Sequence, residues 1–140
     1  MGVVKRAAVV PIGPLDERAN AAMRRADHLH VDRRVAVHIA RDRPSALATR
    51  KWWAHRPHSD WELHLSVGTP VPSTVAAEVR TMISAGFDEV VVVIGFVASS
   101  TPERRLEHDH TAECICTAVG RITGAASILV PVGDRCRRSP

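Results

Sequence analysis

The side chains with the most obvious chemical potential gather in one short segment, from His108 to Cys116. Imidazole and thiolate groups bind zinc, and they also serve as base and nucleophile in covalent catalysis. We expect this segment to be helical, and residues two apart on a helix lie about 200° apart around its axis. Cys114 and Cys116 should therefore point to opposite sides and cannot share a metal ion. His110 and Cys114 could supply two ligands, but no other pair completes the set, so we predict no metal site and no catalytic residue.

His108 shares a helical stripe with Thr111, Ile115, Val119 and Ile122. Apolar residues at this spacing indicate the helix face that covers a sheet. His108 lies in the N-terminal part of the stripe, toward the carboxyl ends of the predicted strands. Two interpretations stay open for it: a buried, hydrogen-bonded histidine of the core, or a side chain that contacts a ligand.

The spacing of the glycines argues against several common classes of enzyme. The chain has no G-x-G-x-x-G segment, no phosphate-binding loop of the Walker type and no nucleophile elbow. The absence of these motifs argues against a dehydrogenase, an ATPase or a hydrolase of standard type. We therefore expect a protein that is not an enzyme.

Length and composition indicate one globular domain. The chain has 140 residues, of which 45% are hydrophobic and 24% charged, with a formal net charge of +4. We expect a single domain over residues 1–134 and a basic, solvated tail over 135–140. The basic excess is modest, and we expect no nucleic-acid partner. An odd number of cysteines, three, and no apolar run near the ~20 residues of a membrane span favour a cytoplasmic location.

Apolar strand-like segments alternate with helical ones along the whole chain. The predicted strands are Arg6–Ile12, Arg34–Ala40, Trp61–Val67, Glu89–Ile94 and Ala126–Val132. The predicted helices cover about Leu15–Leu29, Ser45–His55, Ser73–Ala85 and Thr101–Ile122. This alternation predicts an α/β fold with an open, largely parallel five-stranded sheet and helices on both faces.

Side-chain patterns place the strands within that sheet. Polar and apolar residues alternate along Trp61–Val67, which indicates an edge strand, and Trp52, Trp53 and Trp61 are expected to seal that edge. Glu89–Ile94 is continuously β-branched after its first residue, as in a strand buried on both faces. With the strands numbered in chain order, the sequence predicts the order 3-2-1-4-5.

In such sheets a ligand binds beyond the carboxyl ends of the strands, where the strand order reverses. Here that point lies between the first and fourth strands. Gly95 would let a ligand approach the backbone, and the helix beginning near Ser99–Thr101 would offer N–H groups to phosphate. An ordinary loop with capping residues explains the same pattern. The candidate ligand-binding residues are Pro11, Ile12, Gly13, His38, Ile39, Ala40, Gly95, Phe96, Ser99, Ser100, Arg104 and His108.

The first and last strands, with Ala8–Ile12 and Ile128–Val132, resemble those of the universal stress protein fold. More specifically, the chain is similar to the cytosolic C-terminal domain of amino-acid/polyamine/cation (APC) transporters. The similarity rests on a valine-valine-proline opening followed by Leu15–Arg18, on Arg34–Ile39 and on Glu107–Ala112. The resemblance implies a regulatory domain that senses a ligand and has no resident cofactor; the candidate ligands are adenine nucleotides such as cyclic di-AMP or ATP.

The resemblance also implies a partner. The last strand has an apolar edge with no charged residue, which a second copy would cover, so we expect a homodimer with Ile128, Val130 and Val132 at its interface. A transmembrane transporter domain of the same chain would be a further partner. Gly95 is followed by no glycine until Gly120, unlike the glycine-rich pattern of ATP-binding stress proteins. The alternatives are a stand-alone stress protein that binds ATP or AMP, and a structural dimerisation module with a degenerate pocket.

Overall fold

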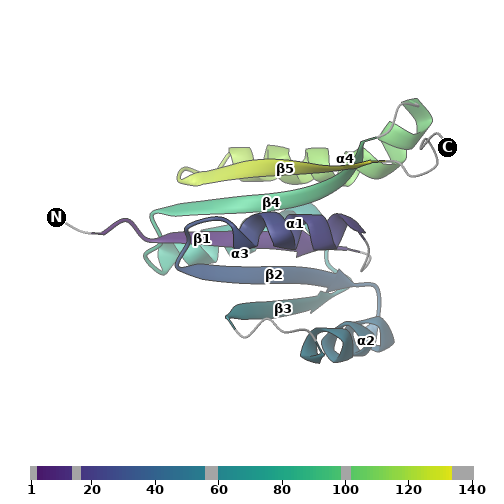
Figure 1. Cartoon of the computed structure of the whole chain (residues 1–140), viewed down its shortest axis with the longest axis horizontal. Helices are drawn as coiled ribbons and strands as arrows, with labels where there is room; N and C mark the ends of the chain where they lie inside the picture. Colours follow the sequence, from purple (N-terminus) through teal and green to yellow (C-terminus); the bar gives the residue numbers. More distant parts are fainter. Residues whose placement is uncertain (1–2, 14–16, 56–59, 99–101, 134–140) are drawn as a thin grey trace.

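Strands and helices alternate along the computed structural model of the protein (Figure 1). The structure describes residues 3–13, 17–55, 60–98 and 102–133, without the side chains of 97–98, 102–109 and 133. The elements are β1 Arg6–Ile12, α1 Glu17–Asp27, β2 Arg33–Ala40, α2 Arg43–Ala54, β3 Trp61–Val67, α3 Val71–Ser84, β4 Glu89–Ala98, α4 Pro102–Gly120 and β5 Ala125–Gly133.

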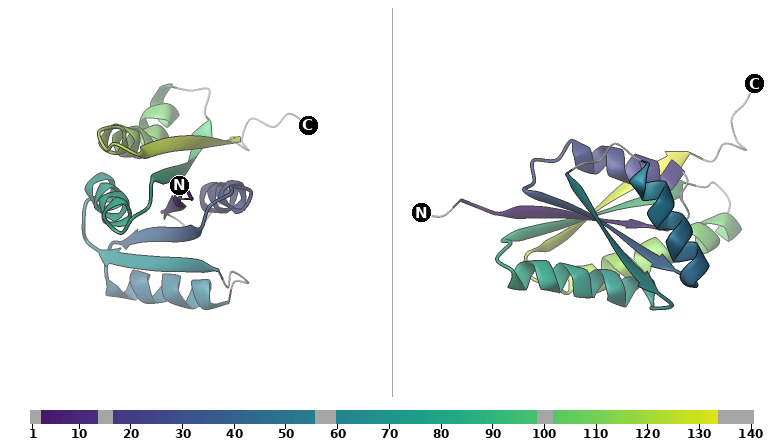
Figure 2. Two further views of the ribbon diagram at one scale, coloured as in Figure 1. Left: turned by 90° about the vertical axis from the view of Figure 1, so that its left-hand side faces the viewer. Right: turned by 90° about the horizontal axis from the view of Figure 1, so that it is seen from below.

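The strands form one parallel sheet in the order β3-β2-β1-β4-β5, as predicted. Val9 in the central strand pairs with Val35 of β2 on one side and with Val92 of β4 on the other. Helices α1 and α2 cover one face of the sheet, and α3 and α4 cover the other (Figure 2). The fold is therefore a three-layered α/β sandwich in which β1 lies at the centre of the sheet, between β2 and β4.

Each face of the sheet carries its own apolar core. Along β1, Ala7 and Val9 contribute to the core under α3 and α4, whereas Ala8, Val10 and Ile12 contribute to the core under α1 and α2. Burying a valine or isoleucine side chain contributes about 1.5–3 kcal/mol. A continuous apolar run is thus what a strand covered on both faces requires.

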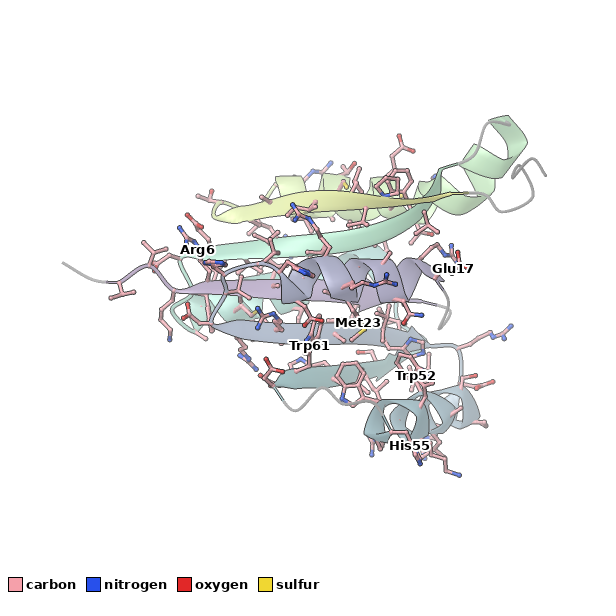
Figure 3. All side chains as sticks on the ribbon, viewed as in Figure 1. Arg6, Glu17, Met23, Trp52, His55 and Trp61 are labelled. Atoms are coloured by element: carbon pink, nitrogen blue, oxygen red, sulfur yellow. The ribbon has the colours of Figure 1, made fainter. Side chains whose placement is uncertain are left out.

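The edge position of β3 is confirmed, and the three tryptophans pack together in the core beside it; Trp52 and Trp61 are labelled in Figure 3. The rings of Trp53 and Trp61 meet edge-on with centroids 6.3 Å apart. The Trp61 indole N–H donates to a carboxylate oxygen of Asp27, 2.9 Å away on α1. The other face of β3 is more covered than its alternation suggested, because His64 bonds to Glu78 of α3 at 2.5 Å.

Most element boundaries differ from those predicted by one or two residues, and the end of β4 differs by four. β4 continues past Ile94 to Ala98, because its last residues pair with β5 from Gly95↔Val130 to Ala98↔Gly133. α2 begins at Arg43, ahead of Ser45, because Asp42 caps it: the Ser45 backbone N–H donates to the Asp42 carboxylate at 2.9 Å. An N-cap carboxylate satisfies backbone N–H groups that the first turn leaves unpaired.

Candidate ligand-binding site

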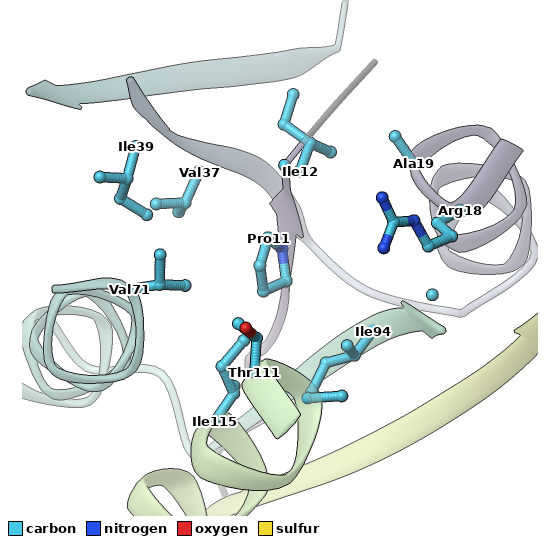
Figure 4. A pocket seen from close by; sticks show the side chains of 13 residues that line it. Pro11, Ile12, Arg18, Ala19, Val37, Ile39, Val71, Ile94, Thr111 and Ile115 are labelled. Carbon is cyan, nitrogen blue, oxygen red and sulfur yellow. The ribbon is translucent and has the colours of Figure 1, made fainter. Parts of the chain in front are cut away.

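A cavity of about 260 Å³ opens at the carboxyl ends of β1, β2 and β4 (Figure 4). This is the place that the strand order predicts for a ligand, since the order reverses between β1 and β4. The lining residues come from every element around that point: Pro11, Ile12, Gly13, Arg18, Ala19, Val37, Ile39, Val71, Ile94, Gly95, Thr111, Ala112 and Ile115.

The walls of the cavity are largely apolar, with polar groups at the facing helices. α1 supplies Arg18, whose guanidinium group points toward the cavity in Figure 4. α4 supplies Thr111, whose hydroxyl lies on the opposite side. Aliphatic walls with a few placed polar groups are the usual composition of a small-molecule site. This arrangement can hold a flat apolar group and place an anionic one beside the arginine.

Gly95 lies at the back of the cavity, and the structure gives it a role that the sequence did not predict. A Cβ atom at this position would lie 2.2 Å from the carbonyl oxygen of Arg18. The group that approaches the backbone of Gly95 is therefore the first turn of α1. Gly95 supports the cavity by letting α1 pack down onto β4.

Five of the predicted residues line the cavity: Pro11, Ile12, Gly13, Ile39 and Gly95. His38, Ala40 and Phe96 are described by the structure and do not line it. Ser99 and Ser100 lie outside the described residues, as do the side chains of Arg104 and His108. The backbone of α4 places positions 104 and 108 on the turns that precede Thr111.

The side chain of His38 lies on the face of β2 that points away from the cavity. Strand alternation turns its neighbours Val37 and Ile39 toward the cavity, which leaves His38 on the opposite face. The side chain is buried, and its Nδ1 lies 2.8 Å from the carbonyl oxygen of Ile12. A carbonyl only accepts, so Nδ1 must carry the proton. His38 thus fastens the end of β1 that forms one wall of the cavity.

Sequence reasoning missed the lining residues Arg18, Ala19, Val37, Val71, Ile94, Thr111, Ala112 and Ile115. Two of them carried a signal: Thr111 and Ile115 lie on the helical stripe that was expected to face the sheet. The period of two in β2 would have selected Val37 with Ile39. Arg18 and Val71 carried no such signal, because they reach the cavity through the positions of α1 and α3 in three dimensions.

The thiols of α4 lie apart, as the helix geometry predicts. The Cys114 sulfur lies 3.7 Å from Nε2 of His110, whereas Cys116 packs against the apolar core of its face of the sheet. Over the described part of the chain, no three potential metal ligands come together.

A chain of charged groups runs across β2, β3 and α3, and none of its members lines the cavity. Arg33 donates to both carboxylate oxygens of Glu62, at 2.5 and 2.8 Å. This bond holds the pKa of the Glu62 carboxyl below its ordinary value and raises the pKa of Arg33. His64 continues the chain, with Nε2 3.5 Å from Glu62 and Nδ1 2.5 Å from Glu78. The arrangement ties the edge strand to its neighbours.

The comparisons with known proteins gave one family. Residues 4–132 match the model of a family described as the KimA potassium transporter C-terminal domain. No curated protein matches the sequence. In the described ranges, the helices are too short or too polar to cross a bilayer.

Proposed function

The chain belongs to the family of C-terminal domains of KimA potassium transporters, and from that premise we propose that it is a cytoplasmic domain that regulates a transporter by binding a small ligand. The role is non-enzymatic. The lining that the structure describes offers one cation and one hydroxyl, with no base placed beside a nucleophile. The transmembrane part of a transporter is the partner to which the domain responds.

The cavity at the reversal of strand order is the observation that carries the ligand proposal. Its aliphatic walls suit an adenine ring, and Arg18 suits a phosphate. The volume, about 260 Å³, falls just below the range of about 300–1,000 Å³ of sites for whole drug-sized ligands. We therefore propose that one cavity holds one nucleoside monophosphate unit, either half of a cyclic di-AMP or part of an ATP. The likeness to universal stress proteins, which carries the ATP alternative, is part of this proposal.

The proposed homodimer would bring two such cavities into one assembly. Among the strands that the structure describes, β5 pairs with β4 only, which leaves the backbone groups of its outer edge for a second copy to pair with. Ile128 and Val130, proposed as interface residues with Val132, are half-buried against the core under α1. Leu129, between them, has 49% of its surface exposed. A two-fold symmetric dinucleotide would then have one half in each protomer.

Thermal unfolding with added nucleotide tests the ligand proposal. A ligand that binds the native state at 100 times its Kd adds about 2.7 kcal/mol to the free energy of unfolding, which raises the melting temperature by several degrees. We expect cyclic di-AMP to produce this shift, and Arg18→Gln to reduce it. Arg24→Gln is the matched control, since Arg24 is an exposed arginine of the same helix that does not line the cavity.

Each other outcome selects a different function. A shift with ATP and none with cyclic di-AMP would favour a nucleotide sensor of the universal stress protein type. No shift with either nucleotide at millimolar concentration would contradict nucleotide binding and leave the structural dimerisation module. An equal loss in Arg18→Gln and Arg24→Gln would place the binding site outside this cavity.

A further inference from the structure

Helix α2 is held to the rest of the molecule by little buried surface. Thr49 is its one buried residue, whereas α1 and α3 each bury four. In Figure 1 the helix lies at the β3 edge of the sheet, near the carboxyl ends of β2 and β3. Most of its circumference therefore faces away from the core.

The outward surface of α2 is basic. Arg43, Arg50 and Lys51 are all exposed, and the helix contains no acidic residue. Its capping residue Asp42 is already bonded to a backbone N–H of the first turn. Within the described ranges, none of the three cations makes an ion pair with a carboxylate. These three positive charges are therefore available to an anionic partner that approaches the exposed surface of α2.

The two helical layers have opposite net charge. In α1 and α2, six cationic residues stand against two carboxylates, which gives a net charge of +4. In α3 and α4, three arginines stand against five carboxylates, which gives −2. The sheet separates the two layers (Figure 2). All the charged side chains of α1 and α2 are described, and the α1–α2 side is the more cationic side of the sheet.

An exposed leucine completes the pattern on α2. Leu47 has 59% of its surface exposed. It lies four residues after Arg43 and four before Lys51, so the three share one stripe of the helix. A helix with cations and a large apolar side chain on its exposed surface is typical of binding at a membrane interface.

We propose that α2, supported by the exposed cations of α1, binds anionic phospholipid headgroups and holds the domain against the membrane surface. The family assignment puts such a surface within reach, because the domain belongs to a membrane transporter. The proposal is independent of nucleotide binding. A lipid surface explains the exposed leucine, which can enter the boundary of the acyl chains. A nucleic acid would use aromatic stacking, and the Trp52 and Trp53 rings pack against the core under α1 instead.

Vesicle co-sedimentation of the full 140-residue chain tests this proposal. We expect binding to vesicles of phosphatidylcholine with phosphatidylglycerol, weakened by salt, and no binding to phosphatidylcholine alone. Arg50→Gln/Lys51→Gln should reduce the affinity about 25-fold, at roughly fivefold per cation near an anionic surface. Arg80→Gln/Arg121→Gln is the matched control: it removes the same charge from exposed residues of the α3–α4 side and should bind as the wild type does.

Leu47→Gln tests the apolar contact, with Leu129→Gln as its control at a similarly exposed leucine of β5. We expect Leu47→Gln to bind anionic vesicles several-fold more weakly than the wild type, and Leu129→Gln to bind as the wild type does. Melting temperatures verify that each variant is folded. The proposal would be overturned if the protein did not bind anionic vesicles, or if both double variants lost affinity equally. It would also be overturned if Arg50 and Lys51 were required for binding an acidic transporter segment or a nucleic acid, and the protein did not bind vesicles.

Discussion

At position 95 the backbone of β4 passes so close to α1 that no side chain fits between them. The Cβ of an alanine would lie 2.2 Å from the Arg18 carbonyl oxygen, which is backbone and cannot rotate away. Overpacking of this kind costs about 1–3 kcal/mol. We therefore predict that Gly95→Ala lowers the free energy of unfolding, measured in urea, by about that amount.

Gly13→Ala is the control for this prediction, because a Cβ at Gly13 meets no atom within 4 Å. It should change the stability by less than about 0.5 kcal/mol. A bulky residue at Gly95 would disturb the fold as well as the cavity, because the displaced group is the backbone of α1. Wild-type stability in Gly95→Ala would show that α1 moves aside at no cost.

The Arg33–Glu62 pair makes stability depend on pH in a definite direction. The hydrogen bond from Arg33 depresses the pKa of Glu62 in the folded protein below its ordinary value of 4.5. A depressed carboxyl pKa contributes stability above the unfolded-state pKa and loses it as the pH falls through the folded-state pKa. We predict that Glu62→Gln is less stable than the wild type at pH 7 and that this difference shrinks below about pH 4.

Urea unfolding at several pH values measures that difference. Glu113→Gln is the control, because Glu113 is an exposed glutamate whose side chain has no such partner among the described residues. Its difference from the wild type should be small at every pH. A Glu62→Gln difference that stayed constant with pH would assign the effect to packing of the side chain and not to its charge.

At the scale of the element, α2 depends on its cap because so little of it is buried. The Ser45 N–H bond that Asp42 accepts also holds the pKa of the Asp42 carboxyl below its ordinary value. We predict that Asp42→Ala loosens the first turn and changes the tryptophan fluorescence, since Trp52 and Trp53 lie on this helix. Asp42→Asn keeps a capping oxygen and should behave like the wild type. Equal spectra in all three proteins would show that packing alone holds α2.

The sequence predicted elements better than it predicted the site. Apolar runs and helical stripes determine which segments form strands and helices, and the alternation of Trp61–Val67 was enough to place an edge. The extension of β4 to Ala98 was missed because it depends on pairing with β5, which no local pattern records. A cavity lies at the carboxyl ends of the strands, where the strand order predicted a ligand site. Its arginine was missed, because Arg18 reaches the cavity only through the packing of α1 on Gly95.

At the scale of the whole molecule, the open edge of β5 predicts a dimer that sedimentation velocity can detect. Leu129→Lys should shift the protein toward monomer, because it places a charge beside the unpaired edge without entering the core. Ile128 and Val130 are poorer positions for this test, since a charge there would also disturb the core under α1. Val67→Lys, at an exposed position of the opposite edge strand, is the control. A monomeric wild type at micromolar concentration would contradict the proposed interface.

The position of β1 at the centre of the sheet has a consequence for synthesis on the ribosome. Its partner β4 begins with Glu89, which pairs with Arg6. Until that residue leaves the ribosome, the nascent chain has a central strand with one side unpaired and the apolar residues of Ala7–Val10 partly uncovered. Exposed apolar strand edges promote association of incomplete chains, and contacts so distant in sequence form late. We therefore expect the nascent chain to need protection by a holding chaperone until β4 has been synthesised and pairs with β1.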